Sequence, residues 1–228
     1  MPNAHQCAAN AIAMGRCRNI PMRGSLMFPL VLALFALATA AQEKVAYTID
    51  NAKSKLQIDV SKEGAFKMFG HDHLIFAKEI SGDVQFDPQK LQDSAVHLKV
   101  SAKSLTAVDP GESDKDRADV QDTMLGEKVL DVAKFPEIVF TSTRVSAVKK
   151  NTDGWELTLA GTLNLHGVER PMSFPLRVHA EAGQVRAQGE VSVLQTDHGI
   201  TPIKVGGGSV KVKDKLKISF TIVATKGS

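Results

Sequence analysis

Alternation of apolar and polar residues is the feature that most constrains the fold of this chain. Between Trp155 and Leu165 every second residue is apolar or glycine, and most residues between them are polar. The same period of two returns at 56–60, 96–100, 174–180, 185–193 and 210–224. Successive side chains of a β-strand point to opposite faces, so the pattern predicts strands with one buried and one solvated face. The run at 210–224 predicts the longest strand.

One segment, 114–131, lacks this alternation and predicts a helix. Its apolar residues fall near helical spacing, and Ser113 followed by Asp114 and Asp116 supplies a capping residue and first-turn acids. We expect about four helical turns. Long alternating strands without regularly interleaved helices are typical of a sandwich or a barrel. A barrel of about eight strands is either filled by its own side chains or holds one small ligand.

Residues 1–41 have the pattern of an export signal. Arg23 precedes an apolar run at 26–38, and small residues follow it. A basic region, a short apolar core and a small-residue site are typical of a secretory signal peptide. The run is too short for a spanning helix, which needs about 20 apolar residues. We expect cleavage after Ala40 or Ala41, which places the protein in the periplasm or outside the cell.

Removing this segment changes the composition of the chain. Both cysteines, Cys7 and Cys17, lie within it, so the remainder can form no disulfide. Three basic residues and no acidic ones are lost, which leaves 25 of each sign among residues 42–228. Balanced charge argues against a nucleic-acid partner. The remaining 187 residues suffice for one domain with a sizeable core.

Four short motifs carry a resemblance to a known family. The stretch 161–171, Gly-Thr-Leu-Asn-Leu-His-Gly-Val-Glu-Arg-Pro, predicts two strands joined by a tight turn in which Gly167 has a positive φ. It resembles the L-T-L-H-G-V-T-K-P element of the YceI-like family. Tyr-Thr-Ile-Asp at 47–50 resembles Y-x-I-D, and 82–88 resembles G-x-I-x-F-D. Residues 130–140 resemble F-D-V-x-K-Y-P-x-I-x-F, and the four motifs occur in the family's order.

The resemblance implies the fold and the ligand. YceI-like proteins are secreted, lipocalin-like barrels that hold isoprenoid lipids, so we expect an all-β, single elongated antiparallel barrel of about eight strands at 42–228, with one α-helix inserted between strands. It implies a carrier or sequestering protein, not an enzyme, for an isoprenoid or similar long-chain lipid. Candidate residues of the apolar channel are Phe66, Phe69, Leu74, Phe76, Phe86, Leu98, Phe140, Leu157, Leu163, Phe174, Leu176, Val191, Ile218 and Phe220.

Histidines give the chain a polar signature within this resemblance. His71 and His73 in Gly-His-Asp-His share one face of a strand, and His198 stands where the family has a phenylalanine. We expect His71, His73 and His198 at the polar end of the cavity. Two alternatives stay open: these histidines are structural, or they bind a metal ion together with His166. The second alternative includes a metalloenzyme that acts on a bound amphiphile.

Other activities have little support in the sequence. There is no Gly-x-Ser-x-Gly element, and no cysteine follows residue 41. We therefore expect no cofactor and no catalytic residue, a lipid as the small-molecule partner, and no membrane-spanning segment after processing. A lysine row at 211–217 is expected on the solvated face of its strand, and a transient contact with anionic lipid is the alternative. A barrel with a filled core, serving only in protein interaction, is the third possibility.

Overall fold

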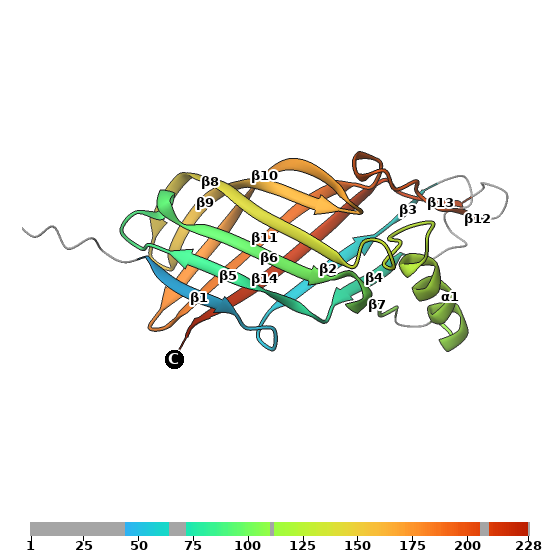
Figure 1. Cartoon of the computed structure of the whole chain (residues 1–228), viewed down its shortest axis with the longest axis horizontal. Helices are drawn as coiled ribbons and strands as arrows, with labels where there is room; N and C mark the ends of the chain where they lie inside the picture. The colour runs from blue at the N-terminus through green and yellow to red at the C-terminus, as the bar shows by residue number, and fades with distance from the viewer. Residues whose placement is uncertain (1–43, 64–71, 110–111, 206–209, 228) are drawn as a thin grey trace, which may run out of the picture. The chain divides into compact units, whose positions relative to one another are not determined.

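Eight antiparallel strands close into a barrel (Figure 1). The computed structural model describes residues 44–63, 72–109, 112–205 and 210–227, within a compact unit of residues 42–228. The predicted signal peptide at 1–41 lies outside the described residues. Around the barrel the strands are β1 (Val45–Ile49), β5 (Ile80–Phe86), β6 (Ala95–Ser101), β8 (Glu137–Asn151), β9 (Gly154–Leu165), β10 (Val168–Glu181), β11 (Gln184–Leu194) and β14 (Lys215–Lys226). Because β14 pairs again with β1, the ladder closes, as the sequence predicted.

Shorter strands extend the wall at one end of the barrel. β2 (Lys55–Val60) pairs with β14 beyond β1, β4 (His73–Ala77) pairs with β2, and β7 (Leu105–Ala107) pairs with β4. A separate small sheet contains β3 (Lys62–Glu63), β12 (Lys204–Val205) and β13 (Val210–Val212). Figure 1 shows these strands at the end of the barrel where the helix lies. This end is therefore more elaborate than the other.

The hairpin between β9 and β10 has the turn that its sequence predicted. Both central residues have positive φ, 54° at His166 and 73° at Gly167. Two consecutive positive φ values define the turn type that suits the right-handed twist of a hairpin. From the turn the ladder runs without a shift, with Val168 opposite Leu165 and Val178 opposite Trp155.

The single α-helix of the described residues is shorter than predicted. α1 spans Asp114–Leu125, and the hydroxyl of Ser113 accepts a hydrogen bond from the backbone N–H of Asp116 at 3.1 Å, as expected for its N-cap. About four turns were expected within 114–131, but only the first 12 residues of that segment are helical. Gly126, a poor helix former, ends the helix, and the chain folds back so that the N–H of Asp131 donates to the Gly126 carbonyl. Residues 126–135 therefore form turns.

The last alternating run is two strands, not one. β13 and β14 are separated at Asp214, whose carboxylate accepts hydrogen bonds from the backbone N–H and the hydroxyl of Thr196 at 2.9 and 2.6 Å. Thr196 begins the short 3-10 helix η4 (Thr196–His198) that follows β11. The interruption thus links the chain after β11 to the start of β14. The longest strand is β8, with 15 residues.

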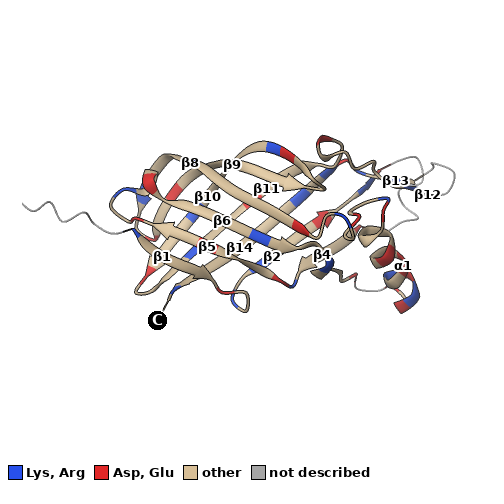
Figure 2. Ribbon diagram, viewed as in Figure 1, with Lys and Arg blue, Asp and Glu red and all other residues tan. Residues whose placement is uncertain are grey.

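Charged side chains lie on the outer face of the wall. Lys213, Lys215 and Lys217 are exposed, as predicted for the lysine row, whereas Lys211 is half-buried and pairs with Glu63 at 3.4 Å. Figure 2 shows basic and acidic residues interspersed over the barrel strands. In the part of the chain that the structure describes, no helix is long and apolar enough to cross a membrane.

Candidate functional site

The barrel encloses an apolar cavity of about 660 Å³. Its lining extends from Phe86 and Leu91 near one end of the barrel to Ile200 and Val212 near the other. The polar residues in the lining are Ser61, Lys62, His73, Ser94, Glu112, Asp119, Thr123 and Gln195. Ligand pockets commonly have volumes of about 300–1,000 Å³ and mostly apolar walls with a few polar groups. The barrel interior is therefore hollow and suited to one apolar molecule.

Most of the predicted channel residues do line this cavity. They are Phe86, Leu98, Phe140, Leu157, Leu163, Phe174, Leu176, Val191, Ile218 and Phe220. Phe66 and Phe69 lie outside the described residues. The prediction for Leu74 and Phe76 was wrong, because alternation along β4 places His73 and Ile75 in the lining and turns Leu74 and Phe76 to the other face. The ring of Phe76 instead lies under the ammonium group of Lys55, 4.9 Å from its centroid.

Three phenylalanine rings form a continuous cluster inside the barrel. The centroids of Phe140 and Phe174 are 5.6 Å apart, and those of Phe174 and Phe220 are 5.8 Å apart. The rings of Phe140 and Phe220, at the two ends of this cluster, each fit beside a glycine on the adjacent strand. A Cβ atom at Gly161 would lie 2.5 Å from the Phe140 ring, and one at Gly189 would lie 2.8 Å from the Phe220 ring. The glycines therefore help to set the bore of the cavity.

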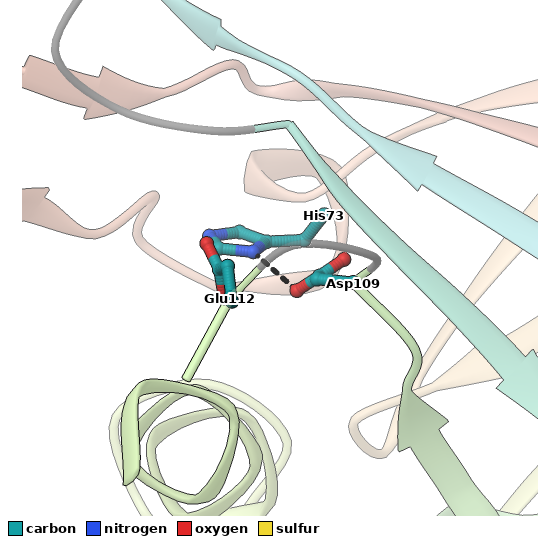
Figure 3. A group of neighbouring side chains, drawn as sticks. All are labelled: His73, Asp109 and Glu112. Atoms are coloured by element: carbon teal, nitrogen blue, oxygen red, sulfur yellow. Dashed lines mark hydrogen bonds and ion pairs between the residues drawn. The ribbon is translucent and has the colours of Figure 1, made fainter. Parts of the chain in front are cut away.

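A histidine and two carboxylates meet at one end of the cavity (Figure 3). Nδ1 of His73 lies 2.8 Å from Oδ2 of Asp109, while Oδ1 of Asp109 accepts the backbone N–H of Leu74 at 2.7 Å. Asp109 is only 4% exposed, whereas His73 and Glu112 are half-buried and line the cavity. One ligand atom from each of the three side chains lies within 4.8 Å of the others. We call these three residues the mouth triad.

The strand pairing explains why the triad assembles. β4 begins at His73 and runs antiparallel to β7, so the start of β4 lies beside the end of β7. The chain then reaches Asp109 two residues after β7, and the Val108 N–H donates to the Leu74 carbonyl at 2.8 Å. Glu112 comes shortly before α1. No sequence motif singled out Asp109 or Glu112, because no local pattern reports the pairing that brings them to His73.

Two other histidines in the predicted site lie elsewhere. His198 is 2% exposed, is absent from the cavity lining, and donates from Nδ1 to the Val168 carbonyl at 2.9 Å. Its placement at the polar end of the cavity was therefore wrong, and its contact is a structural one between η4 and β10. His166 packs against Phe135, with ring centroids 4.5 Å apart, and belongs to no metal-ligand group among the described residues. His71 lies outside the described residues.

Helix α1 forms part of the cavity wall beside the mouth triad. Val120, Thr123 and Met124 line the cavity from the helix. Gln121 ties the helix to the edge of β7: its Nε2 donates to the Leu105 carbonyl at 2.7 Å, and its Oε1 accepts the Ala107 N–H at 2.9 Å. One amide side chain thus continues the backbone ladder where β7 has no further strand among the described residues. The sequence gave no sign of this role for Gln121.

One carboxylate close to this end of the barrel has a perturbed pKa. The hydroxyl of Thr196, together with its backbone N–H, lowers the pKa of Asp214 below the ordinary value of 3.8. Hydrogen bonds to the ionised form favour that form. At neutral pH, Asp214 is therefore a stable, charged link between β14 and η4.

A closed antiparallel barrel with a hollow apolar interior defines the class of barrels that enclose a small ligand. Within that class, the chain belongs to the YceI-like family, whose domain profile matches residues 47–224. It is 30% identical over 200 residues to a UPF0312 protein of Shewanella denitrificans, an alignment that covers 84% of this chain and 95% of that protein.

Solved structures show the same fold. BcnA of Burkholderia cenocepacia superposes with a TM-score of 0.61 at 21% identity, covering 78% of this chain and 99% of that one. A polyisoprenoid binding domain of Saccharophagus degradans gives a TM-score of 0.56 at 16% identity, covering 81% of this chain and all of that one. The predicted family and fold are thereby confirmed.

Proposed function

We propose that the protein is a periplasmic or secreted carrier that holds an isoprenoid or similar long-chain lipid inside its barrel. The single observation that carries this proposal is the apolar cavity of about 660 Å³ along the barrel interior. Membership of the YceI-like family supports it, as does the likeness to a domain described as polyisoprenoid binding. We infer a binding protein, not an enzyme.

The physical reason is burial of the ligand. Each buried CH₂ group contributes about 0.8 kcal/mol, and a long apolar chain finds no such environment in water. The strand ladder is closed, so the barrel wall surrounds a bound chain around its whole circumference. The polar lining at the mouth triad gives the ligand's polar end a place to lie.

Charge substitutions on the two faces of the wall test this proposal. Leu163→Asp and Phe174→Glu would place an unpaired charge in the cavity, so we expect both variants to lose co-purifying lipid and some stability. Lys213→Glu and Lys215→Glu change exposed residues and should retain the lipid. Native mass spectrometry and lipid extraction supply the readout. Equal lipid content in all four variants would rule out the cavity as the binding site.

Export is a separate part of the proposal. We expect the exported protein to begin at Ala41 or Gln42, since the pattern of residues 1–41 is that of a signal peptide. N-terminal sequencing of protein from the periplasmic fraction measures this directly. A protein that retains residues 26–38 would overturn the soluble carrier while leaving the cavity itself unaffected.

A further inference from the structure

We propose that the mouth triad binds one divalent transition-metal ion. Ligand atoms of His73, Asp109 and Glu112 already lie within 4.8 Å of one another. Two ligands of one zinc ion lie no more than about 4.4 Å apart, because each lies about 2.0–2.2 Å from the metal. Only a small movement of the side chains is needed to close around an ion.

The ligand types fit this class of ion. Imidazole nitrogen and carboxylate oxygen together suit zinc, manganese and iron, whereas calcium and magnesium prefer oxygen alone. Three protein ligands leave a coordination position open, as in catalytic or substrate-binding zinc sites. His73 and Glu112 line the cavity, so we place that open position toward the cavity interior.

Part of the triad is held in place before any ion arrives. Asp109 is 4% exposed, and its Oδ1 is fixed by the N–H of Leu74 at 2.7 Å. His73 is the first residue of β4, and Asp109 follows the end of β7. The pairing of β4 with β7 therefore fixes the backbone that carries both residues. Two carboxylates beside one imidazole also give the site a net negative charge when all three are deprotonated, which favours a cation.

Other described histidines offer matched controls. His179 lies on the outer face of β10, exposed, with Nε2 2.9 Å from a carboxylate oxygen of Glu181. His97 is half-buried, with Nδ1 3.1 Å from the hydroxyl of Thr141. Neither belongs to a group of three possible ligands within the described ranges. A surface histidine beside one carboxylate should therefore not hold an ion as the triad does.

A metal bound at the triad would also anchor the ligand. An oxygen atom on the polar end of a bound lipid could occupy the open position, which would select hydroxyl, phenol or carbonyl head groups over a bare hydrocarbon. This step rests on the proposed function, whereas metal binding itself does not. A protein that binds zinc but no lipid would refute the carrier proposal and leave the metal site standing.

The experiment measures zinc and cobalt binding to the full chain with Cys7→Ser and Cys17→Ser, because those thiols could bind zinc outside the barrel. After chelator treatment, the protein is dialysed against each ion and its metal content is determined. Affinity is measured by competition with a chelating dye, and the visible spectrum of the cobalt form reports the coordination. We expect one ion per chain, and His73→Ala and Glu112→Gln should each weaken binding by at least about tenfold.

Controls separate the triad from surface binding and from misfolding. His179→Ala should leave zinc affinity unchanged, and thermal melts followed by circular dichroism show whether each variant folds. Asp109→Asn keeps an oxygen that can accept the Leu74 N–H, so this variant tests the buried carboxylate as a metal ligand. If Asp109→Asn does not fold, the His73→Ala and Glu112→Gln variants alone decide whether the triad binds metal. Less than about 0.2 ion per chain in the unsubstituted triad, or unchanged affinity in His73→Ala and Glu112→Gln, would overturn the site.

Discussion

At the scale of single residues, two glycines and three phenylalanine rings help to set the width of the cavity inside the barrel. Gly189 lies directly opposite Phe220 in the pairing of β11 with β14, and a Cβ there would also come within 3.2 Å of Leu176. Glycine usually weakens a strand, since it has no side chain to pack and loses more conformational freedom on folding. Here the lack of a side chain at Gly189 leaves the space that the Phe220 ring occupies.

Gly189→Ala should therefore destabilise the barrel. The added methyl group has to displace the Phe220 ring, and such overpacking costs about 1–3 kcal/mol. In a Phe220→Leu background the same substitution should cost less, because the smaller side chain gives way. Urea unfolding of both single variants and the double variant measures the coupling. Strictly additive free energies of unfolding would show that the glycine has no packing role toward this ring.

Asp214 gives a pH-dependent contribution to stability. Its pKa is lowered in the folded protein by the hydrogen bonds from Thr196, so its contribution is full above the unfolded-state pKa and is lost as pH falls through the folded-state value. Asp214→Asn should cost about 1 kcal/mol at pH 7 and progressively less below about pH 4. Urea unfolding at pH 7 and pH 3 measures both values. Asp197→Asn, an exposed neighbour on η4, should show no such convergence with the parent protein.

The alternation of side chains along each strand explains which site residues the sequence could predict. The ten predicted channel residues that line the cavity lie on strands whose alternation defines the inner face. On β4 the run His-Leu-Ile-Phe-Ala is apolar on both faces, so Leu74 and Phe76 looked as suitable as Ile75. The inward position of His73 decides between them, because residues two apart share a face. The prediction for His198 was wrong for another reason. The burial of His198 depends on a contact with Val168 of β10, which is 30 residues away in the sequence.

At the scale of elements, helix α1 completes the wall where the sheet ends. β8 begins at Glu137, which lies opposite Ser101, so β8 does not extend as far as β7. β7 is the last strand in the order of its sheet and has no strand on its outer edge within the described residues. Unpaired strand edges are sites of unwanted pairing, and covering them is one way in which proteins protect them. α1 fills this place, with Gln121 bonded to the edge and Val120 turned to the cavity.

Gln121→Ala should loosen this wall. Two hydrogen bonds to the β7 backbone are lost, for a cost of about 1–2 kcal/mol, and the free N–H of Ala107 adds to it. Hydrogen exchange should accelerate in α1 and β7 while the far end of the barrel, at β1, stays protected. Asp122→Ala changes an exposed neighbour on the same helix and serves as the control. Uniform acceleration over all strands would mean that the helix is not an independently opening wall.

Element types were predictable here, but their contacts were not. Alternation specified the long strands, and the capping residue Ser113 located the start of the helix. The division at Asp214 depends on a turn whose stabilising partner, Thr196, is elsewhere in the chain. Likewise the mouth triad requires the β4–β7 pairing, which joins segments about 30 residues apart. Local pattern carries no information about such partners.

At the scale of the whole molecule, the closed ladder keeps the interior open. An open sheet could fold over and bring its apolar faces together, but strand number, tilt and register fix the width of a closed barrel. The seam is formed by β1 and β14, with Tyr47 opposite Lys226 and Ile49 opposite Ala224. Where β1 gives way to β2, the hydroxyl of Ser54 accepts the N–H of Val223 at 3.0 Å and preserves the seam. The lining therefore lacks the packing partners that a collapsed core would supply, and a ligand can provide them.

Filling the cavity should therefore raise the thermal stability of the whole barrel. A ligand present at about 100 times its Kd stabilises the folded state by about 2.7 kcal/mol if it binds only that state. For a domain of this size each kcal/mol shifts Tm by about 2–4 °C, so adding a long-chain polyprenol to delipidated protein should raise Tm by roughly 5–11 °C. Differential scanning calorimetry with increasing polyprenol measures the shift. In Leu163→Asp, whose cavity carries a charge, the same titration should leave Tm unchanged. A parent protein equally indifferent to the polyprenol would mean that the hollow interior is not where an isoprenoid chain binds.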